Sequence, residues 1–165
     1  MRPIIYSLYL LAVGAIWQPA AALETDSKQP IYIESNSAIF DDSKGEGSYD
    51  GNVQVTQGSI RINADRMLVY TTNRKIDKVV ALGNPVRFEQ SPGENKEHIH
   101  GHSLRAEYYV AESRLVLLQE AVVHQGSNTY ASDRIEYNSN TSIVQAGQKT
   151  SDKQRVHVTL QPNNK

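Results

Sequence analysis

Apolar and polar residues alternate along most of the chain from Pro30 onward. This period of two places every second side chain on the same face and is typical of β-strands with one buried face. No stretch after Pro30 has the three- and four-residue spacing of an amphipathic helix. The clearest alternating positions are Ile31/Ile33, Val53/Val55, Ile60/Ile62, Leu68/Tyr70, Val86/Phe88, Tyr108/Val110, Ile135/Tyr137 and Val156/Val158/Leu160. The pattern predicts an all-β fold.

Short clusters rich in Gly, Asn, Asp, Ser and Pro separate the alternating runs. They fall at 41–45, 50–52, 58–59, 72–73, 83–85, 91–93, 126–128 and 138–140. These residue types favour tight turns because they tolerate left-handed backbone or bond their own backbone. We therefore expect many short antiparallel strands joined by turns.

The sequence also contains an internal repeat. QGSIRINADRMLV at 57–69 aligns without gaps on QGSNTYASDRIEY at 125–137, with five identities in thirteen positions. The step Gly51-Asn52-Val53 recurs as Gly-Asn-Pro-Val at 83–86. A short supersecondary unit is therefore predicted to be stacked several times. Asp65 and Asp133 hold the same place in the repeat, and we expect them to fix a turn or an edge of each unit.

A stack of strands leaves one unpaired strand at each end, and such edges pair readily with other chains. The first predicted strand follows Pro30, and the last one alternates up to Pro162, with no proline or other edge-blocking residue inside either. We therefore expect both edges to dock to partner strands. The predicted docking residues are Ile31, Tyr32, Ile33, Val156, Val158 and Leu160.

The first 22 residues have the pattern of a cleavable signal peptide. Arg2 precedes an uncharged apolar run at 4–17, and Ala20-x-Ala22 forms a cleavage motif. The run is shorter than the roughly 20 residues that a membrane-spanning helix needs. Cleavage is predicted between Ala22 and Leu23. Residues 23–160 then form one exported domain, followed by a short tail at 161–165.

Charge and composition exclude several classes of protein. The 165-residue chain has 17 Lys and Arg against 18 Asp and Glu; removing Arg2 leaves 16 against 18, a net charge of −2. Nucleic-acid binding requires a basic excess that is not present. Cysteine is absent, so disulfides and thiolate metal sites are excluded. Since the sequence has no nucleophile elbow, zinc-protease motif or phosphate loop, we expect neither an enzyme nor a cofactor.

Three histidines, His98, His100 and His102, recur at spacing two. In an extended strand they would share one face, as the ligands of a metal site do. However, the proline, glycine and asparagine residues at 92–101 predict a loop. No functional metal site is therefore predicted here.

Three segments resemble the LptA family of periplasmic lipopolysaccharide transport proteins. They are QPIYIES at 29–35, GNVQVTQGSIRINAD at 51–65 and GNPVRFEQ at 83–90, and the resemblance extends from about residue 29 to 160. It implies a single β-jellyroll that is open at both ends. It also implies head-to-tail pairing with the jellyrolls of an inner-membrane-anchored partner and an outer-membrane partner, and lipid acyl chains held in an apolar interior.

The resemblance assigns a ligand to the inward-facing strand positions. Alternation by itself fits an ordinary dry core equally well. Exposing a single twelve-carbon chain to water costs on the order of 10 kcal/mol, so a carrier has to cover it at every step. The predicted lipid-binding positions are Ile31, Ile33, Val53, Val55, Ile60, Ile62, Val86, Phe88, Tyr108 and Val110.

The sequence favours a periplasmic lipopolysaccharide bridge that associates with itself head to tail. Basic side chains such as Arg61, Arg66 and Arg105 could meet lipid phosphates outside the groove. One alternative is the inner-membrane-anchored component of the same pathway, which would keep its N-terminal segment. A second is a right-handed β-solenoid that binds or cleaves polysaccharide through an exposed aromatic face, and a third is a structural filament. The candidate aromatic residues are Tyr108, Tyr109, Tyr130 and Tyr137.

Overall fold

The computed structural model describes residues 26–91, 97–147 and 155–162; the predicted signal peptide lies outside these residues. A short 3-10 helix, η1 (Asp26–Lys28), precedes ten strands. They are β1 (Ile31–Glu34), β2 (Ser37–Asp41), β3 (Glu46–Gln57), β4 (Ile60–Thr72), β5 (Lys75–Gln90), β6 (Ile99–Tyr109), β7 (Arg114–Gln125), β8 (Asn128–Asn138), β9 (Ile143–Ala146) and β10 (His157–Thr159). The prediction of an all-β fold is confirmed.

All ten strands belong to one antiparallel sheet, with the order β1-β3-β4-β5-β6-β7-β8-β10. Two further strands share the terminal positions, because β2 also pairs with β3 and β9 also pairs with β8. A right-handed β-solenoid is built from parallel strands. The antiparallel pairing therefore rules out the solenoid alternative.

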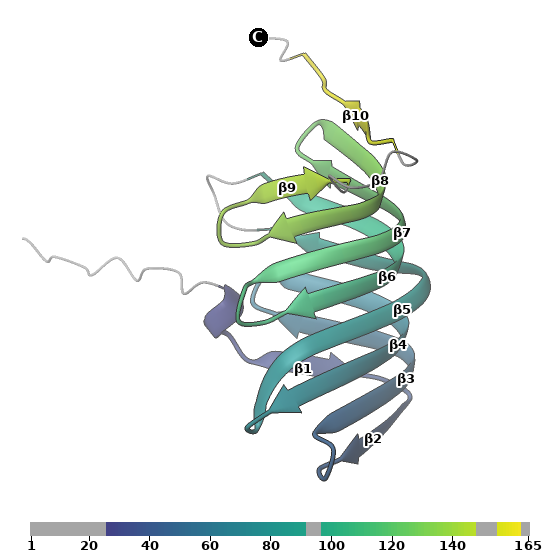
Figure 1. Cartoon of the computed structure of the whole chain (residues 1–165), viewed down its shortest axis with the longest axis vertical. Helices are drawn as coiled ribbons and strands as arrows, with labels where there is room; N and C mark the ends of the chain where they lie inside the picture. The colour runs from purple at the N-terminus through teal and green to yellow at the C-terminus, as the bar shows by residue number, and fades with distance from the viewer. Residues whose placement is uncertain (1–25, 92–96, 148–154, 163–165) are drawn as a thin grey trace, which may run out of the picture.

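The sheet folds over on itself along a line of β-bulges. Each pair of long neighbouring strands has a register shift, and the shifts lie at Asp50/Val53, Asn63/Arg66, Leu82/Val86, His102/Arg105 and Leu118/Ala121. Bulges bend a strand and increase its twist without ending it. Figure 1 shows the strands curving round at one side while the hairpins gather at the opposite side. The two halves of the sheet therefore face each other as the layers of a β-jellyroll.

The bend explains where the sequence prediction was wrong about strand length. The Gly-Asn steps at 51–52 and 83–84 were expected to be turns, but they lie inside β3 and β5. Gly51 and Asn52 have positive φ angles of 80° and 48°, which a bulge uses as readily as a turn. At the other step, Asp65 of β4 accepts a hydrogen bond from the Asn84 N–H at 3.0 Å. This bond fixes the bend at 83–84, a role of the kind expected for Asp65. Strands β3 to β8 are consequently 11 to 16 residues long.

The internal repeat corresponds to two equivalent hairpins. Its copies span the end of β3 with most of β4, and the end of β7 with most of β8. Each begins with a glutamine and a glycine of positive φ, 58° at Gly58 and 56° at Gly126. The predicted stacked unit is thus a hairpin that crosses the bend.

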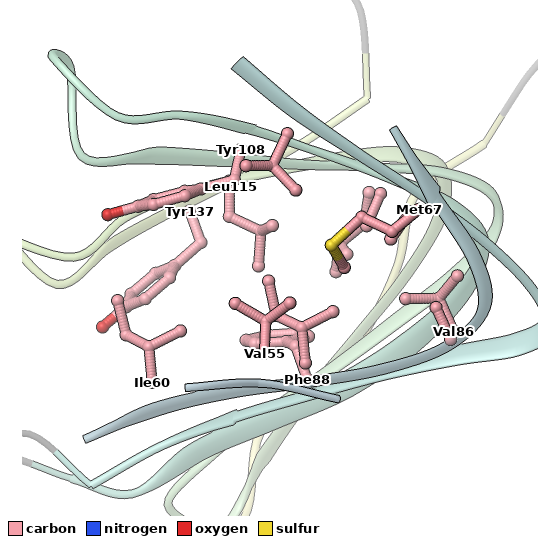
Figure 2. Close-up of a cluster of buried hydrophobic side chains, with 14 of the residues drawn as sticks. Val55, Ile60, Met67, Val86, Phe88, Tyr108, Leu115 and Tyr137 are labelled. Carbon is pink, nitrogen blue, oxygen red and sulfur yellow. The ribbon is translucent and has the colours of Figure 1, made fainter. Parts of the chain in front are cut away.

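The core lies between the two layers and draws on every strand from β3 to β8. Met67, Leu117, Val123 and Ile135 at its centre have no exposed surface. Figure 2 shows side chains from opposite layers meeting in this space. Each such side chain contributes about 1.5 to 3 kcal/mol by leaving water, so this interior stabilises the fold.

Candidate functional site

The structure places all ten predicted lipid-binding positions on the inner face of the jellyroll. Ile31, Ile33 and Val110 are half-buried and pack against the core. The other seven are buried, namely Val53, Val55, Ile60, Ile62, Val86, Phe88 and Tyr108. Their inward placement is confirmed, whereas contact with lipid stays a prediction.

The described interior contains a small hollow. A hollow among Ile60, Ile62, Phe88, Tyr108 and Leu115 has a free volume of only about 10 Å³. That is about the room of one water position. An acyl chain can therefore enter this hollow only if its walls move apart.

Polar side chains join the two layers on the side opposite the bend. We call this side the lateral mouth; the strand ends at Gln57, Gln90 and Gln125 lie there, and Gln125 bonds Ser142 in the turn before β9. The Tyr137 hydroxyl donates to Gln90 Oε1 at 2.8 Å. Tyr137 lies in β8 and Gln90 in β5, which are not neighbours in the sheet. This hydrogen bond therefore crosses from one layer to the other.

The short helix η1 lies at the lateral mouth (Figure 1). Asp26 Oδ1 accepts the Ser59 N–H, and Asp26 Oδ2 accepts the Ser59 hydroxyl, both at 2.7 Å. The amide of Gln90 donates to the same carboxylate. Asp26 thus connects the start of the described chain to the turn between β3 and β4 and to the end of β5.

Two tyrosine hydroxyls stand at the polar end of this apolar interior. Burial, with a smaller contribution from the Asp26 carboxylate, raises the pKa of Tyr108 to about 12. Burial also raises the pKa of Tyr137. The two rings point their oxygens the same way in Figure 2. Within the described part of the chain, the Tyr108 hydroxyl is buried without a hydrogen-bond partner.

Two strands form each edge of the sheet. Strands β1 and β2 form the edge beside β3, and strands β9 and β10 form the edge beside β8. In the residues that the structure describes, every large apolar side chain with high exposure lies at one of these edges. They are Tyr32, Ile39, Phe40, Ile143, Val156, Val158 and Leu160.

The predicted edge residues are only partly those that point outward. Tyr32 is exposed, but Ile31 and Ile33 face the interior because neighbouring residues of a strand point to opposite sides. Val158 lies in β10, whereas Val156 and Leu160 flank this three-residue strand. The sequence prediction missed β2 and β9, whose short runs at 37–41 and 143–146 have no clear alternation.

Two of the three histidines lie in a strand and not in a loop, so the loop expectation was wrong for His100 and His102, whereas His98 precedes the strand. His100 and His102 belong to β6, where they share the outer face. The His100 ring stacks on His98 at 5.2 Å and on His124 of β7 at 4.9 Å, between ring centroids. Burial and these two neighbours lower the pKa of His100. Among the described residues, no group of His, Asp or Glu is arranged to hold a metal ion.

Several outer basic residues already have acidic partners. Arg61 pairs with Glu89 at 3.5 Å, and Arg66 pairs with Asp50 at 3.1 Å. Arg105 pairs with Glu107 at 2.6 Å. The first two pairs are exposed on both sides and therefore contribute little stability.

The tyrosines do not form the exposed aromatic face that polysaccharide binding would need. Tyr108 and Tyr137 are buried in the core, and Tyr130 packs against it.

In the part of the chain that the structure describes, there is no helix long and apolar enough to span a membrane.

The fold and its edges define a β-jellyroll with an apolar interior and two strand edges open to pairing. Over residues 32–143 the sequence matches the family described as LptA/(LptD N-terminal domain) LPS transport protein. The chain belongs to this family.

Individual relatives agree with the family match. The chain is 35% identical to the lipopolysaccharide export system protein LptH of Pseudomonas aeruginosa, over 99% of this chain and 95% of the relative. It is 34% identical to LptA of Escherichia coli K12, over 88% of this chain and 78% of the relative. A crystal structure of Pseudomonas aeruginosa LptH superimposes with a TM-score of 0.76 at 33% identity, covering 84% of this chain and 99% of that one.

Proposed function

We propose that this protein is a periplasmic bridge that carries lipopolysaccharide from the inner to the outer membrane. The observation that carries the proposal is the apolar interior between two layers, with an open apolar strand edge at each end of the sheet. The related LptH is described as a periplasmic component of a lipopolysaccharide transport device. The signal-like pattern at 1–22 supports export to the same compartment.

The physical problem of such a bridge is to keep acyl chains away from water at every step. Pairing β1 and β2 of one molecule with β9 and β10 of the next would continue the sheet, and with it the interior. The same edges would receive the jellyrolls of an inner-membrane-anchored partner and an outer-membrane partner. Lipid then passes between molecules without crossing water, which avoids a cost of about 0.8 kcal/mol for each exposed methylene.

The proposed function is tested by direct binding to rough lipopolysaccharide. We expect the mature protein, starting at Leu23, to remove lipopolysaccharide from vesicles and to elute with it in size-exclusion chromatography. Failure to bind would overturn the proposal. Mass spectrometry of the protein purified from cells should find Leu23 as the first residue. A retained N-terminus would instead favour the inner-membrane-anchored component.

The edges should produce open head-to-tail chains. Tyr32→Lys together with Ile39→Lys places charges on one edge, and Val158→Lys places a charge on the other; we expect each to prevent chain growth. Because head-to-tail contacts do not close, a mixture of the two variants should stop at heterodimers. Light scattering over a dilution series measures this, with Gln54→Lys on the outer face of β3 as the control. If the edge variants form chains as long as those of the control, the edge-pairing account is contradicted.

A further inference from the structure

A row of three glutamines, two of them buried, follows the lateral mouth from strand to strand. Gln57, Gln90 and Gln125 are the last residues of β3, β5 and β7. The strand register pairs Gln57 with Ile60, Ile60 with Gln90, Gln90 with Ile99, and Ile99 with Gln125. Glutamine and isoleucine therefore alternate along one line across the sheet.

These glutamines point inward, unlike most polar residues at strand ends. Gln57 and Gln90 are each 3% exposed, in line with Ile60 and Ile99 beside them. Gln125 is half-buried. A buried amide costs free energy unless it is hydrogen-bonded, so two buried glutamines and a half-buried one along the same row require an explanation.

Each amide bonds a segment that closes the mouth. Gln57 Nε2 donates to the carbonyl oxygen of Gln29 at 3.1 Å, just before β1. Gln125 Nε2 donates to the carbonyl oxygen of Ser142 at 3.2 Å, just before β9. Gln90 bonds Asp26 and Tyr137, as described above. The row thus marks the boundary between the apolar interior and the outside.

The chemistry of this boundary selects an uncharged group. The hollow behind it is lined by apolar residues with Gln90, Ser113, Ser139 and the two buried tyrosines, and by no basic residue. The nearby Asp26 carboxylate is negative, so phosphate and carboxylate ligands are disfavoured here. Amides and hydroxyls can both donate and accept, which suits ester and amide linkages.

The spacing along the row also suits a lipid with several chains. Neighbouring glutamines lie two strands apart, which corresponds to about 10 Å across a sheet. The buried hydroxyl of Tyr108 is a further donor, without a partner in the described residues. A multi-acyl lipid carries a carbonyl or hydroxyl near the head of each chain, at the depth where these donors lie.

We propose that Gln57, Gln90 and Gln125 form a polar rail that binds the uncharged linkage groups at the heads of the acyl chains. The chains extend into the interior, and the charged headgroup stays outside the mouth. This assignment rests on the proposed function and adds the position of the lipid within the same site. Loading exchanges the bonds to Gln29, Asp26 and Ser142 for bonds to the lipid as the layers part.

The test compares two probes on the full mature protein. Gln57→Leu, Gln90→Leu and Gln125→Leu are combined, with the exposed Gln54→Leu as the matched control. The probes are rough lipopolysaccharide and diphenylhexatriene, a hydrocarbon dye with no linkage group. Since one hydrogen bond contributes about 1 kcal/mol, we expect the triple variant to bind lipopolysaccharide about tenfold to a hundredfold more weakly. Its affinity for the dye should not decrease.

Other outcomes separate the rail from the function. If the wild type does not bind lipopolysaccharide, the proposed function fails and the rail fails with it. If the wild type binds and the triple variant binds equally well, only the rail is wrong. Tighter binding of both probes by the variant would mean that the glutamines merely hold the mouth shut, which also overturns the rail.

A second measurement uses the wild type alone. Triple-resonance spectra of the isotope-labelled wild type assign the side-chain NH₂ signals of its glutamines. Adding lipopolysaccharide should shift the signals of Gln57, Gln90 and Gln125 and leave that of Gln54 in place. Unmoved signals in the presence of bound lipopolysaccharide would contradict the rail.

Discussion

Replacing Phe88 with alanine is expected to lower the free energy of unfolding by about 3 to 5 kcal/mol. Phe88 is only 3% exposed, and its ring centroid lies 6.4 Å from that of Tyr137 in the opposite layer. Truncation therefore removes buried area and leaves a cavity between the layers. Because domains of this size have only about 5 to 15 kcal/mol of stability, the loss should move the urea midpoint strongly.

The only other phenylalanine provides the matched control. Phe40 lies in β2 at the sheet edge, and 57% of its surface is exposed. Phe40→Ala should change the stability of the monomer by less than about 0.5 kcal/mol. It should instead weaken self-association. Equal losses of stability for the two variants would show that the interior is not the core described here.

Gly101→Ala is expected to cost roughly 3 kcal/mol, at the upper end of the usual range for overpacking. A Cβ at this position would overlap the carbonyl oxygen of Val122 and lie 2.7 Å from Phe88 Cε1. The first obstacle is backbone of the neighbouring strand β7, which cannot turn aside as a flexible side chain can. The variant should therefore melt well below the wild type or fail to accumulate in folded form.

Gly47→Ala is the control for this substitution. Its Cβ would lie 3.1 Å from the ring of Tyr49, a side chain that can adjust. We expect a much smaller change in melting temperature, measured by circular dichroism. If Gly101→Ala and Gly47→Ala melted alike, the close approach of β6 and β7 at Gly101 would be wrong.

The inward face of the sheet was predictable because a strand has a strict period of two. At Val53/Val55 and Ile60/Ile62 the predicted inner positions are buried. The alternation at Leu68/Tyr70 misled, because these side chains are half-buried and Met67 and Val69 take the inner positions. In the run of apolar residues at 115–118, the period of two does not tell which side chains face inward. In the structure, Leu115 and Leu117 do. In such a run, the pairing with neighbouring strands decides the face.

The bends were not predictable from local sequence. Gly-Asn steps are typical of turns, so the steps at 51–52 and 83–84 were interpreted as turns, but the positive φ angles of Gly51 and Asn52 serve a bulge equally well. The inward orientation of the glutamine row was not predicted, for a related reason. A polar residue at the end of a strand usually faces water, and only the folding-over of the sheet encloses Gln57 and Gln90.

The central claim, that acyl chains travel between the two layers, is tested most directly by photocrosslinking in cells. Benzoylphenylalanine is placed at Phe88 or Ile33 on the inner face, and at Arg87 as an exposed control on the outer face of the same strand as Phe88. We predict lipopolysaccharide adducts from Phe88 and Ile33 and none from Arg87. Absence of adducts from both inner positions, or an equal yield from Arg87, would contradict the account.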